Sequence, residues 1–300
     1  MTTPRFKGII PPLITPLKDR DTLDQAGLEQ IIEHVIAGGV HGLFALGTTG
    51  EGPSLSYRLR TEVIQKVSKT VNGRIPVFIS VTDTSFVESV RLSQVASDSG
   101  ADAVVLATPY YFPTDQEELT RYVQHIVPEL ALPVMLYNMP SLTKVWFEIE
   151  TINALSSIDQ ILGVKDSGGN LEYYARLCKL QSERPDWSFL MGPEELMIQS
   201  ISLGGHGGVN GGANVYPRLF VEAYEAAVSG DSKRCDELQE KIEAFGKIYD
   251  FGKNSSRYIK TTKCAASILD LCDDFMAEPF IRLGQNDREK LRDILNNLKL

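Results

Sequence analysis

The sequence predicts a (β/α)8 barrel, the TIM-barrel class of α/β fold, followed by a C-terminal helical extension. Eight short apolar runs rich in β-branched residues recur along the chain, and most are apolar on both faces, as in a buried parallel sheet. Helical patterns lie between these runs, and strands that alternate with helices form parallel sheets with right-handed crossovers. The length of 300 residues suits one large domain of this kind.

Each apolar run has the length of a buried strand. In chain order the predicted strands are Gly8–Thr15, Gly42–Gly47, Pro76–Val81, Ala103–Thr108, Pro133–Asn138, Ile161–Asp166, Ser188–Gly192 and Gly207–Gly211.

Several of the intervening helices carry start signals. Asp24 and Ser56 stand where N-cap residues are expected, each before an apolar 3.6-residue pattern. Thr114 and Glu117 have the spacing of a capping box. Pro193 has the position of a first-turn proline.

The rival fold is a doubly wound open sheet, which usually shows a glycine-rich phosphate turn after its first strand. Here the first strand ends in Ile14-Thr15-Pro16-Leu17, which is no such turn. After Val215 the pattern is wholly helical. We therefore expect residues 1–230 to form the barrel with the active site, and residues 231–300 to form a helical extension packed on it.

The charge and composition favour a cytoplasmic protein that binds a small molecule. The net charge of -9 argues against nucleic-acid and anionic-membrane partners, and no segment is long and apolar enough to span a membrane. No secretory signal is evident at the start. The four cysteines and four histidines are scattered, without metal-ligand spacing, so no metal is expected.

Active sites of such barrels lie at the carboxyl ends of the strands. The second predicted strand runs into Gly47-Thr48-Thr49-Gly50-Glu51-Gly52, where two hydroxyls and flanking backbone groups could bind a carboxylate. The same residues could equally form a glycine-rich turn with a Ser/Thr cap.

The sixth predicted strand contains a lysine. Alternation directs Leu162, Val164 and Asp166 toward the surrounding helices, and Gly163 and Lys165 toward the barrel interior. Burial lowers the pKa of an amine, and a neutral amine can attack a ketone to form an imine. The alternative is a lysine at the strand end that reaches solvent, and alternation alone leaves both interpretations open.

Two groups of aromatic residues also follow strands. Tyr137, near the end of the fifth strand, could relay protons or simply fill the core. The segment Thr108-Pro109-Tyr110-Tyr111-Phe112 after the fourth strand could line a core or a subunit interface.

Taken together, these motifs resemble the dihydrodipicolinate synthase / N-acetylneuraminate lyase family of pyruvate-dependent aldolases over nearly the whole chain. The matching segments are Gly8-Ile9-Ile10-Pro11-Pro12 with Thr15-Pro16, Gly47 to Glu51, Gly100-Ala101-Asp102-Ala103, Tyr137-Asn138-Met139-Pro140, Gly163-Val164-Lys165-Asp166, and Ala213-Asn214-Val215 with Pro217 to Phe220.

The resemblance implies a role for each matching residue. Lys165 stands where the family has its Schiff-base lysine, and Tyr137 where it has a proton-transferring tyrosine. Thr48 and Thr49 match the pair that binds the pyruvate carboxylate and completes a hydroxyl relay. Tyr111 matches a tyrosine that reaches a neighbouring subunit's site. The family also implies a homotetramer, built as a dimer of dimers, and no metal or organic cofactor.

The second substrate is harder to infer. The synthase branch has an arginine for the second substrate's carboxylate where this chain has Leu142, and leucine there is similar to the lyase branch. Gly192-Pro193-Glu194-Glu195 resembles a lyase motif that binds sugar hydroxyls, although Glu194 could instead be a helix N-terminal acid. A serine of the lyase pocket is replaced here by Gly211. The expected substrate-binding residues are Thr48, Thr49, Gly50, Leu142, Ser167, Gly192, Glu194, Glu195 and Val209.

The leading hypothesis is a lyase that cleaves or forms a 2-oxo-4-hydroxy acid, such as a sugar acid, from pyruvate and an aldehyde. The segment Val164 to Gly169 also resembles aldolases of 4-hydroxy-2-oxoglutarate. The alternatives are 4-hydroxy-tetrahydrodipicolinate synthesis, which Leu142 disfavours, dehydration of a 2-oxo-3-deoxy sugar acid, and non-catalytic binding of 2-oxo acids. An unrelated phosphate-binding barrel isomerase would rest on fold analogy alone.

Overall fold

A computed structural model describes residues 4–254 and 256–298 and confirms the barrel. Eight parallel strands form one sheet, in the order β1-β10-β9-β8-β7-β6-β5-β4. The strands are β1 (Gly8–Ile9), β4 (Leu43–Ala45), β5 (Val77–Ser80), β6 (Ala103–Ala107), β7 (Val134–Asn138), β8 (Ile161–Asp166), β9 (Ser188–Met191) and β10 (Gly207–Gly208). All eight lie within the predicted runs.

The sheet closes between β1 and β4, the two ends of that order. Pro12, just beyond β1, forms a parallel bridge with Phe44 of β4. The Leu13 amide donates to the Phe44 carbonyl at 2.8 Å, and the Phe44 amide donates to the Pro11 carbonyl at 3.0 Å. These bonds pair strand backbone that would otherwise be left unpaired at an edge.

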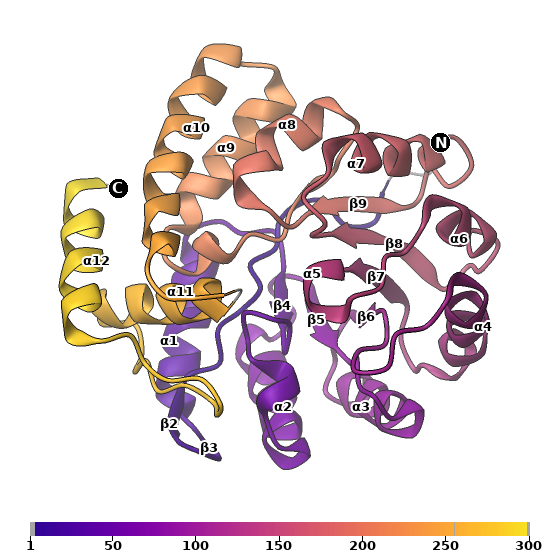
Figure 1. The fold of residues 1–300 in the computed structure, drawn as a ribbon, viewed down its shortest axis with the longest axis horizontal. Coiled ribbons are helices and arrows are strands. Elements are labelled where there is room, and N and C mark those ends of the chain that lie inside the picture. Colours follow the sequence, from indigo (N-terminus) through magenta and orange to yellow (C-terminus); the bar gives the residue numbers. More distant parts are fainter. Residues whose placement is uncertain (1–3, 255, 299–300) are drawn as a thin grey trace.

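Helices surround the sheet (Figure 1). They are α1 (Gln25–Ala37), α2 (Tyr57–Val71), α3 (Phe86–Asp98), α4 (Gln116–Ile126), α5 (Pro140–Thr143), α6 (Ile149–Ala154), α7 (Leu171–Cys178), α8 (Met197–Ser202), α9 (Pro217–Ser229), α10 (Ser232–Gly246), α11 (Ser256–Ile268) and α12 (Gln285–Leu298). A short hairpin of β2 (Leu17–Asp19) and β3 (Thr22–Leu23) precedes α1.

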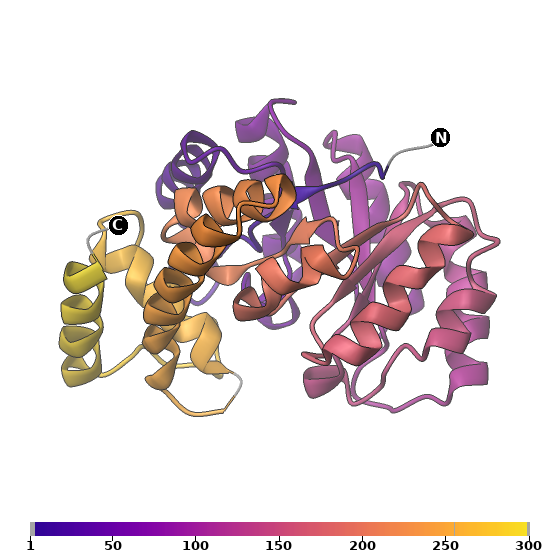
Figure 2. The ribbon, with the colours of Figure 1, turned by 90° about the horizontal axis from the view of Figure 1, so that it is seen from above.

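The last three helices, α10 to α12, gather on one side of the barrel, at the left of both views (Figure 2). Helix α11 packs against the short turn Gly211–Asn214 that follows β10, and α10 packs along α9. The C-terminal helices therefore reach the carboxyl end of the barrel. Among the described residues, no helix is both long and apolar enough to cross a membrane.

The predicted helix starts are partly right. Ser56 caps α2, because its side chain accepts a hydrogen bond from the Leu59 amide. Asp24 occupies the N-cap position of α1, but its side chain makes no capping bond. The capping box before α4 was predicted one residue too early, since it is formed by Asp115 and Glu118.

The helix after β9 also begins differently from the prediction. Pro193 is the residue that precedes a 3-10 turn, Glu194–Leu196, and α8 follows that turn. The proline therefore lies just before the helical residues and not in the first turn of an α-helix.

The barrel interior holds an apolar cluster of its own, which includes Phe44, Phe78, Met135 and Leu190. Leu162 belongs to this inner cluster, so the prediction that it faces the helices is wrong. The cause is a register shift between β7 and β8, where Val134 pairs with Ile161 but Met135 pairs with Gly163. One extra residue at such a bulge reverses the local alternation.

Candidate active site

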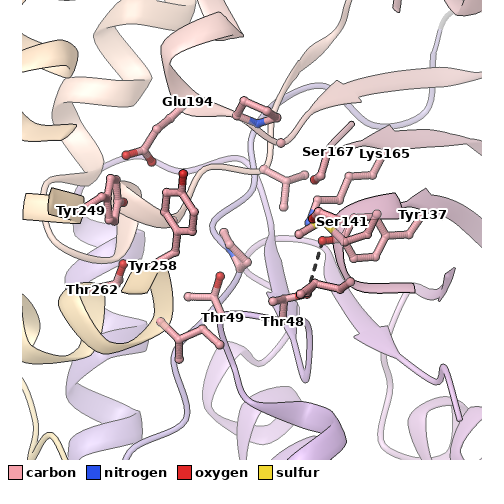
Figure 3. A pocket seen from close by; sticks show the side chains of 18 of the residues that line it. Thr48, Thr49, Tyr137, Ser141, Lys165, Ser167, Glu194, Tyr249, Tyr258 and Thr262 are labelled. Carbon is pink, nitrogen blue, oxygen red and sulfur yellow. Dashed lines mark hydrogen bonds between the residues drawn. The ribbon is translucent and has the colours of Figure 1, made fainter. Parts of the chain in front are cut away.

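A cavity of about 340 Å³ opens at the carboxyl ends of the strands (Figure 3). Most of the predicted site residues line it, although they come from five different strand ends. These are Thr48, Thr49, Tyr137, Leu142, Lys165, Ser167, Gly192, Glu194, Glu195 and Val209. Gly50 and Tyr111 are not among the lining residues.

Lys165 lies on β8 and points into this cavity (Figure 3). Its side chain is nearly buried, and Nζ lies 5.0 Å from the centre of the Phe44 ring. Burial lowers the pKa of the amine, because the charged form loses its hydration. Lys165 therefore faces inward, as one of the two interpretations of the sequence had it. Its amine, which loses its proton more easily than a free lysine, lies where a ligand can reach it.

Tyr137 is paired with Lys165 across β7 and β8. Its hydroxyl lies 3.4 Å from Thr48 Oγ1, a hydrogen bond in which either oxygen can donate. Burial would raise the pKa of Tyr137, but the positive charge on Lys165 and hydrogen bonds with Thr48 and Ser167 lower it overall. A phenol in this environment can give up and take back a proton beside the amine.

The loop that carries Thr48 and Thr49 is bracketed by two residues in the left-handed region, Leu46 with φ 60° and Glu51 with φ 56°. Such a backbone is unfavourable for residues other than glycine and needs support from its surroundings. Gly50 is part of that support, since its carbonyl accepts a hydrogen bond from Thr15 Oγ1 at 2.7 Å. Gly50 does not line the cavity, and its predicted part in substrate binding stays a prediction.

The segment after Lys165 is fixed by a buried carboxylate. Asp166 Oδ1 accepts hydrogen bonds from Asn138 Nδ2 at 2.7 Å and from the Gly168 amide at 3.1 Å. The Ser167 amide donates to the Asn138 carbonyl at 2.9 Å. These contacts hold Ser167 at the cavity wall beside the amine.

Glu194 lies on another wall of the cavity and is almost fully buried. Its Oε2 accepts a hydrogen bond from the Gly212 amide at 2.8 Å, while its Oε1 has no partner among the residues that the structure describes. Burial raises the pKa of this carboxyl to about 7. The group can therefore donate as well as accept a hydrogen bond near neutral pH. Glu195 lines the same cavity.

The C-terminal helices complete the cavity, which the sequence did not predict. Tyr258, Ile259 and Thr262 of α11, together with Tyr249 before it, line the wall opposite Lys165 (Figure 3). Their four-residue spacing, from Tyr258 to Thr262, places them on one helix face. That spacing was visible in the sequence, but it does not say which partner the face meets.

Leu142 stands at the mouth of the cavity on the short helix α5, about a third exposed, at 38 %. Met139 and Ser141 lie beside it on the same wall. No arginine or lysine other than Lys165 lines the cavity among the described residues. A second substrate therefore meets an apolar side chain and hydroxyl groups at the mouth. It meets no cation that could bind a carboxylate.

Tyr111 lies outside the cavity of its own chain and is 83 % exposed. It has φ 81° and packs edge-on against Phe112, which is also exposed, with ring centres 4.9 Å apart. Tyr110, by contrast, lines a smaller neighbouring cavity that shares Thr48 and Tyr137 with the first. The role of Tyr111 in a neighbouring subunit remains a prediction.

Within residues 4–254 and 256–298, no group of three or more His, Cys, Asp or Glu side chains is placed to hold a metal ion. The groups that converge on the cavity are instead an amine, phenols, alcohols and carboxyls. Together they can form an imine with a ketone and move protons around it.

Comparison with known proteins agrees with this geometry. Residues 5–298 match the model of the dihydrodipicolinate synthetase family. A curated relative, 4-hydroxy-tetrahydrodipicolinate synthase of Methanocaldococcus jannaschii, is 33% identical over 98% of this chain and 99% of its own.

Solved structures give the same result. Dihydrodipicolinate synthase from Bacteroides thetaiotaomicron has a TM-score of 0.95 and 49% identity, covering 98% of this chain and 99% of that one. YagE, a prophage protein of this family from E. coli K12, was solved in complex with pyruvate; its TM-score is 0.93, with 27% identity over 99% of both chains. The chain is thus an enzyme of the lysine Schiff-base aldolase class, and it belongs to the dihydrodipicolinate synthetase family.

Proposed function

We propose that this enzyme holds pyruvate, or a related 2-oxo acid, as a Schiff base on Lys165 and cleaves or forms a 2-oxo-4-hydroxy acid. The observation that carries the proposal is the buried Lys165 amine, which lies in the cavity with its pKa lowered and Tyr137 beside it. Thr48 and Thr49 lie on the cavity wall, where their hydroxyls can bind the carboxylate of the oxo acid.

The chemistry follows from these positions. The neutral amine attacks the ketone carbon, water leaves, and a protonated imine forms. In the cleavage direction the C4 hydroxyl gives its proton to Tyr137, the C3–C4 bond breaks, and its electron pair passes to the imine as an enamine while an aldehyde departs. Protonation of the enamine at C3 and hydrolysis then release pyruvate and free the amine. Thr48, bonded to the Tyr137 hydroxyl, continues the proton path.

The aldehyde that we propose is neutral and hydroxylated. Leu142 offers no charge at the mouth, and Glu194 and Glu195 would repel a further carboxylate when ionised. Glu194 Oε1 makes no hydrogen bond of normal length with the described residues, although the nearby Tyr249 hydroxyl lowers the pKa of this carboxyl, and the oxygen can accept a hydrogen bond from a hydroxyl group of a sugar-like chain.

A second candidate is 4-hydroxy-tetrahydrodipicolinate synthesis, the activity in the names of the curated relatives. The identity of 49% to the Bacteroides thetaiotaomicron synthase favours this candidate. Leu142 opposes it, because an apolar side chain cannot pair with a second substrate's carboxylate.

The first experiment is borohydride reduction in the presence of pyruvate, followed by peptide mass spectrometry. We expect a stable adduct on the peptide that contains Lys165, and none in the Lys165→Arg variant, whose guanidinium stays protonated. Because burial lowers the pKa of Lys165, the adduct should form at a lower pH than a free lysine side chain needs. An adduct on another lysine, or none, would overturn the proposal.

The second experiment identifies the aldehyde. Pyruvate is supplied with aspartate semialdehyde, N-acetylmannosamine, glyoxylate or glyceraldehyde, and both directions are followed. Condensation with a neutral hydroxylated aldehyde supports the proposal, whereas preference for aspartate semialdehyde supports the synthase. Loss of water from a 2-oxo-3-deoxy sugar acid, without cleavage of its carbon chain, would instead show a dehydratase.

We also propose that turnover needs neither a metal nor an organic cofactor, since the imine on Lys165 itself withdraws the electrons of the breaking bond. Activity that survives exhaustive chelation and gel filtration supports this. Activity that is lost on chelation and restored by one added metal would contradict it.

A further inference from the structure

A buried ion pair joins the loop that carries Thr48 and Thr49, called here the threonine loop, to the C-terminal helices. Lys263 Nζ lies 2.6 Å from Glu51 Oε1, and both side chains are completely inaccessible to solvent. The second oxygen, Glu51 Oε2, accepts a hydrogen bond from the Ala277 amide at 2.8 Å. The partners are 212 residues apart in the sequence.

Glu51 is tied directly to the threonine loop. Its amide donates to the Thr48 carbonyl at 3.0 Å and closes the turn that presents Thr48 and Thr49. The backbone of Glu51 is left-handed, with φ 56°, where glycine would be accommodated more easily. The contacts of its side chain therefore hold a conformation that the backbone of this residue disfavours.

Lys263 is tied to the opposite wall. It lies in α11, directly after Thr262 and four residues after Ile259, both of which line the cavity. Thr48 and Thr49 lie on one wall of the cavity and Thr262 on another (Figure 3). One ion pair thus connects the loop behind the first wall to the helix behind the second.

Stability alone does not account for such a pair. The cost of removing two charges from water often cancels their attraction, and well-packed apolar side chains frequently stabilise a core as much or more. What an ion pair with a second hydrogen bond provides is a defined geometry, because the carboxylate has to meet both donors at once.

We propose that Glu51 and Lys263 are positioning residues, which fix the Thr48–Thr49 loop against helix α11 so that the loop can bind the carboxylate of the 2-oxo acid bound at Lys165. This inference rests on the proposed function. Neither side chain lines the cavity, so both act through the loop and the helix.

The test measures the pyruvate concentration that gives half-maximal borohydride trapping on Lys165, alongside stability to denaturant. Three variants are compared: Glu51→Gln, Lys263→Met, and both together. Each single variant leaves one buried group without its charged partner, and is expected to lose stability. The double variant leaves no buried charge, and its glutamine can still accept from the Ala277 amide, so its stability should recover.

The trapping of pyruvate on Lys165 distinguishes a positioning role of the ion pair from a role in stabilising the fold. If the pair positions the loop, the double variant is stable but still needs about tenfold more pyruvate, as expected when a carboxylate loses one well-aligned hydrogen bond. Its maximal extent of trapping on Lys165 should stay close to that of the wild type, since Lys165 and Tyr137 are not changed.

The matched control is Asp186→Asn. Asp186 pairs with Arg184 at 2.6 Å, and Arg184 also binds the carbonyl of Ile161 at the amino end of β8, away from the cavity. This variant should lose stability without a change in the pyruvate requirement.

A stable double variant with the pyruvate requirement of the wild type would overturn the positioning role. An Asp186→Asn variant that needs as much additional pyruvate as the Glu51 and Lys263 variants would overturn it as well. Failure of the wild type to form any adduct is a separate result, because it would overturn the proposed function and this inference with it.

Discussion

Tyr137 and Lys165 are direct neighbours on adjacent parallel strands, and Lys165 Nζ lies 3.9 Å from the centre of the Tyr137 ring. The ring covers the amine, and the tyrosine hydroxyl meets Thr48 at its far side. Strand pairing thus fixes the distance between the group that forms the imine and the group that moves protons. A contact between strand neighbours needs no loop to order before catalysis.

Replacing Tyr137 by phenylalanine should separate imine formation from proton transfer. The ring still packs against Phe44, but the hydroxyl is lost. We expect kcat for aldol cleavage to fall about 100-fold or more, as is usual when a general acid–base is removed, while pyruvate is still trapped on Lys165. The control Tyr216→Phe removes a hydroxyl that bonds to the Leu295 carbonyl, and should change kcat less than about twofold. Equal effects of the two variants would contradict the proton-transfer role.

Leu142 should control the charge of the second substrate. An arginine at this partly exposed position can form a bidentate pair with a carboxylate. Leu142→Arg is expected to raise kcat/KM for aspartate semialdehyde about 10- to 100-fold relative to a neutral aldehyde, which corresponds to one charged hydrogen-bonded contact. Leu142→Lys supplies charge without the fork geometry and should gain less. An unchanged ratio in both variants would show that the cavity selects substrates elsewhere.

The Glu194 carboxyl should make stability depend on pH. Its pKa is raised by burial from 4.5 to about 7, so the folded protein binds a proton there that the unfolded chain has already released. Stability from this group is complete below about pH 4.5 and is lost as the pH rises to about 7, by about 3 kcal/mol in total.

Denaturant unfolding of the wild type and of Glu194→Gln across this range tests that expectation. The variant cannot titrate at this position, so its stability should rise relative to the wild type as the pH increases. Parallel curves for the two proteins would show that Glu194 titrates normally.

Two histidines at the other end of the barrel should have the opposite pH dependence. His41 Nδ1 accepts a hydrogen bond from the Ile9 amide at 3.1 Å, and His206 Nδ1 accepts one from the Phe189 amide at 3.0 Å. Burial lowers the pKa of both rings below 6.5. The unfolded chain therefore gains protons first as the pH falls below about 6.5, and stability is lost in that direction.

The double variant His41→Gln/His206→Gln should lose less stability than the wild type between neutral pH and about pH 5, as followed by denaturant unfolding. Trapping of pyruvate at neutral pH should be unchanged, because neither ring lines the cavity. A fall in stability as large as that of the wild type would assign the pH dependence to other groups.

The strand positions could be predicted because a buried parallel strand and an amphipathic helix each leave a local periodic pattern. The same alternation allowed Lys165 to face inward, and the structure has it buried at the cavity. The alternation failed at Leu162, three residues earlier, because the bulge against β7 shifts the register and no local pattern records it. The capping box before α4 was predicted one residue too early for a different reason. Thr114 and Asp115 both have side chains that can cap a helix, and the local pattern does not say which of them does.

The sequence by itself determined the barrel and the positions of its strands, and it placed Lys165, Tyr137, Thr48 and Thr49 at strand ends. It left open whether Lys165 faces the interior or reaches solvent, which the tertiary structure decided. Only the tertiary structure decided that α11 closes the cavity, and that Lys263 meets Glu51 across 212 residues. Periodicity reports which face of an element is apolar, but not which distant element that face will contact. The pairing of two buried charges is set by the packing of the whole chain.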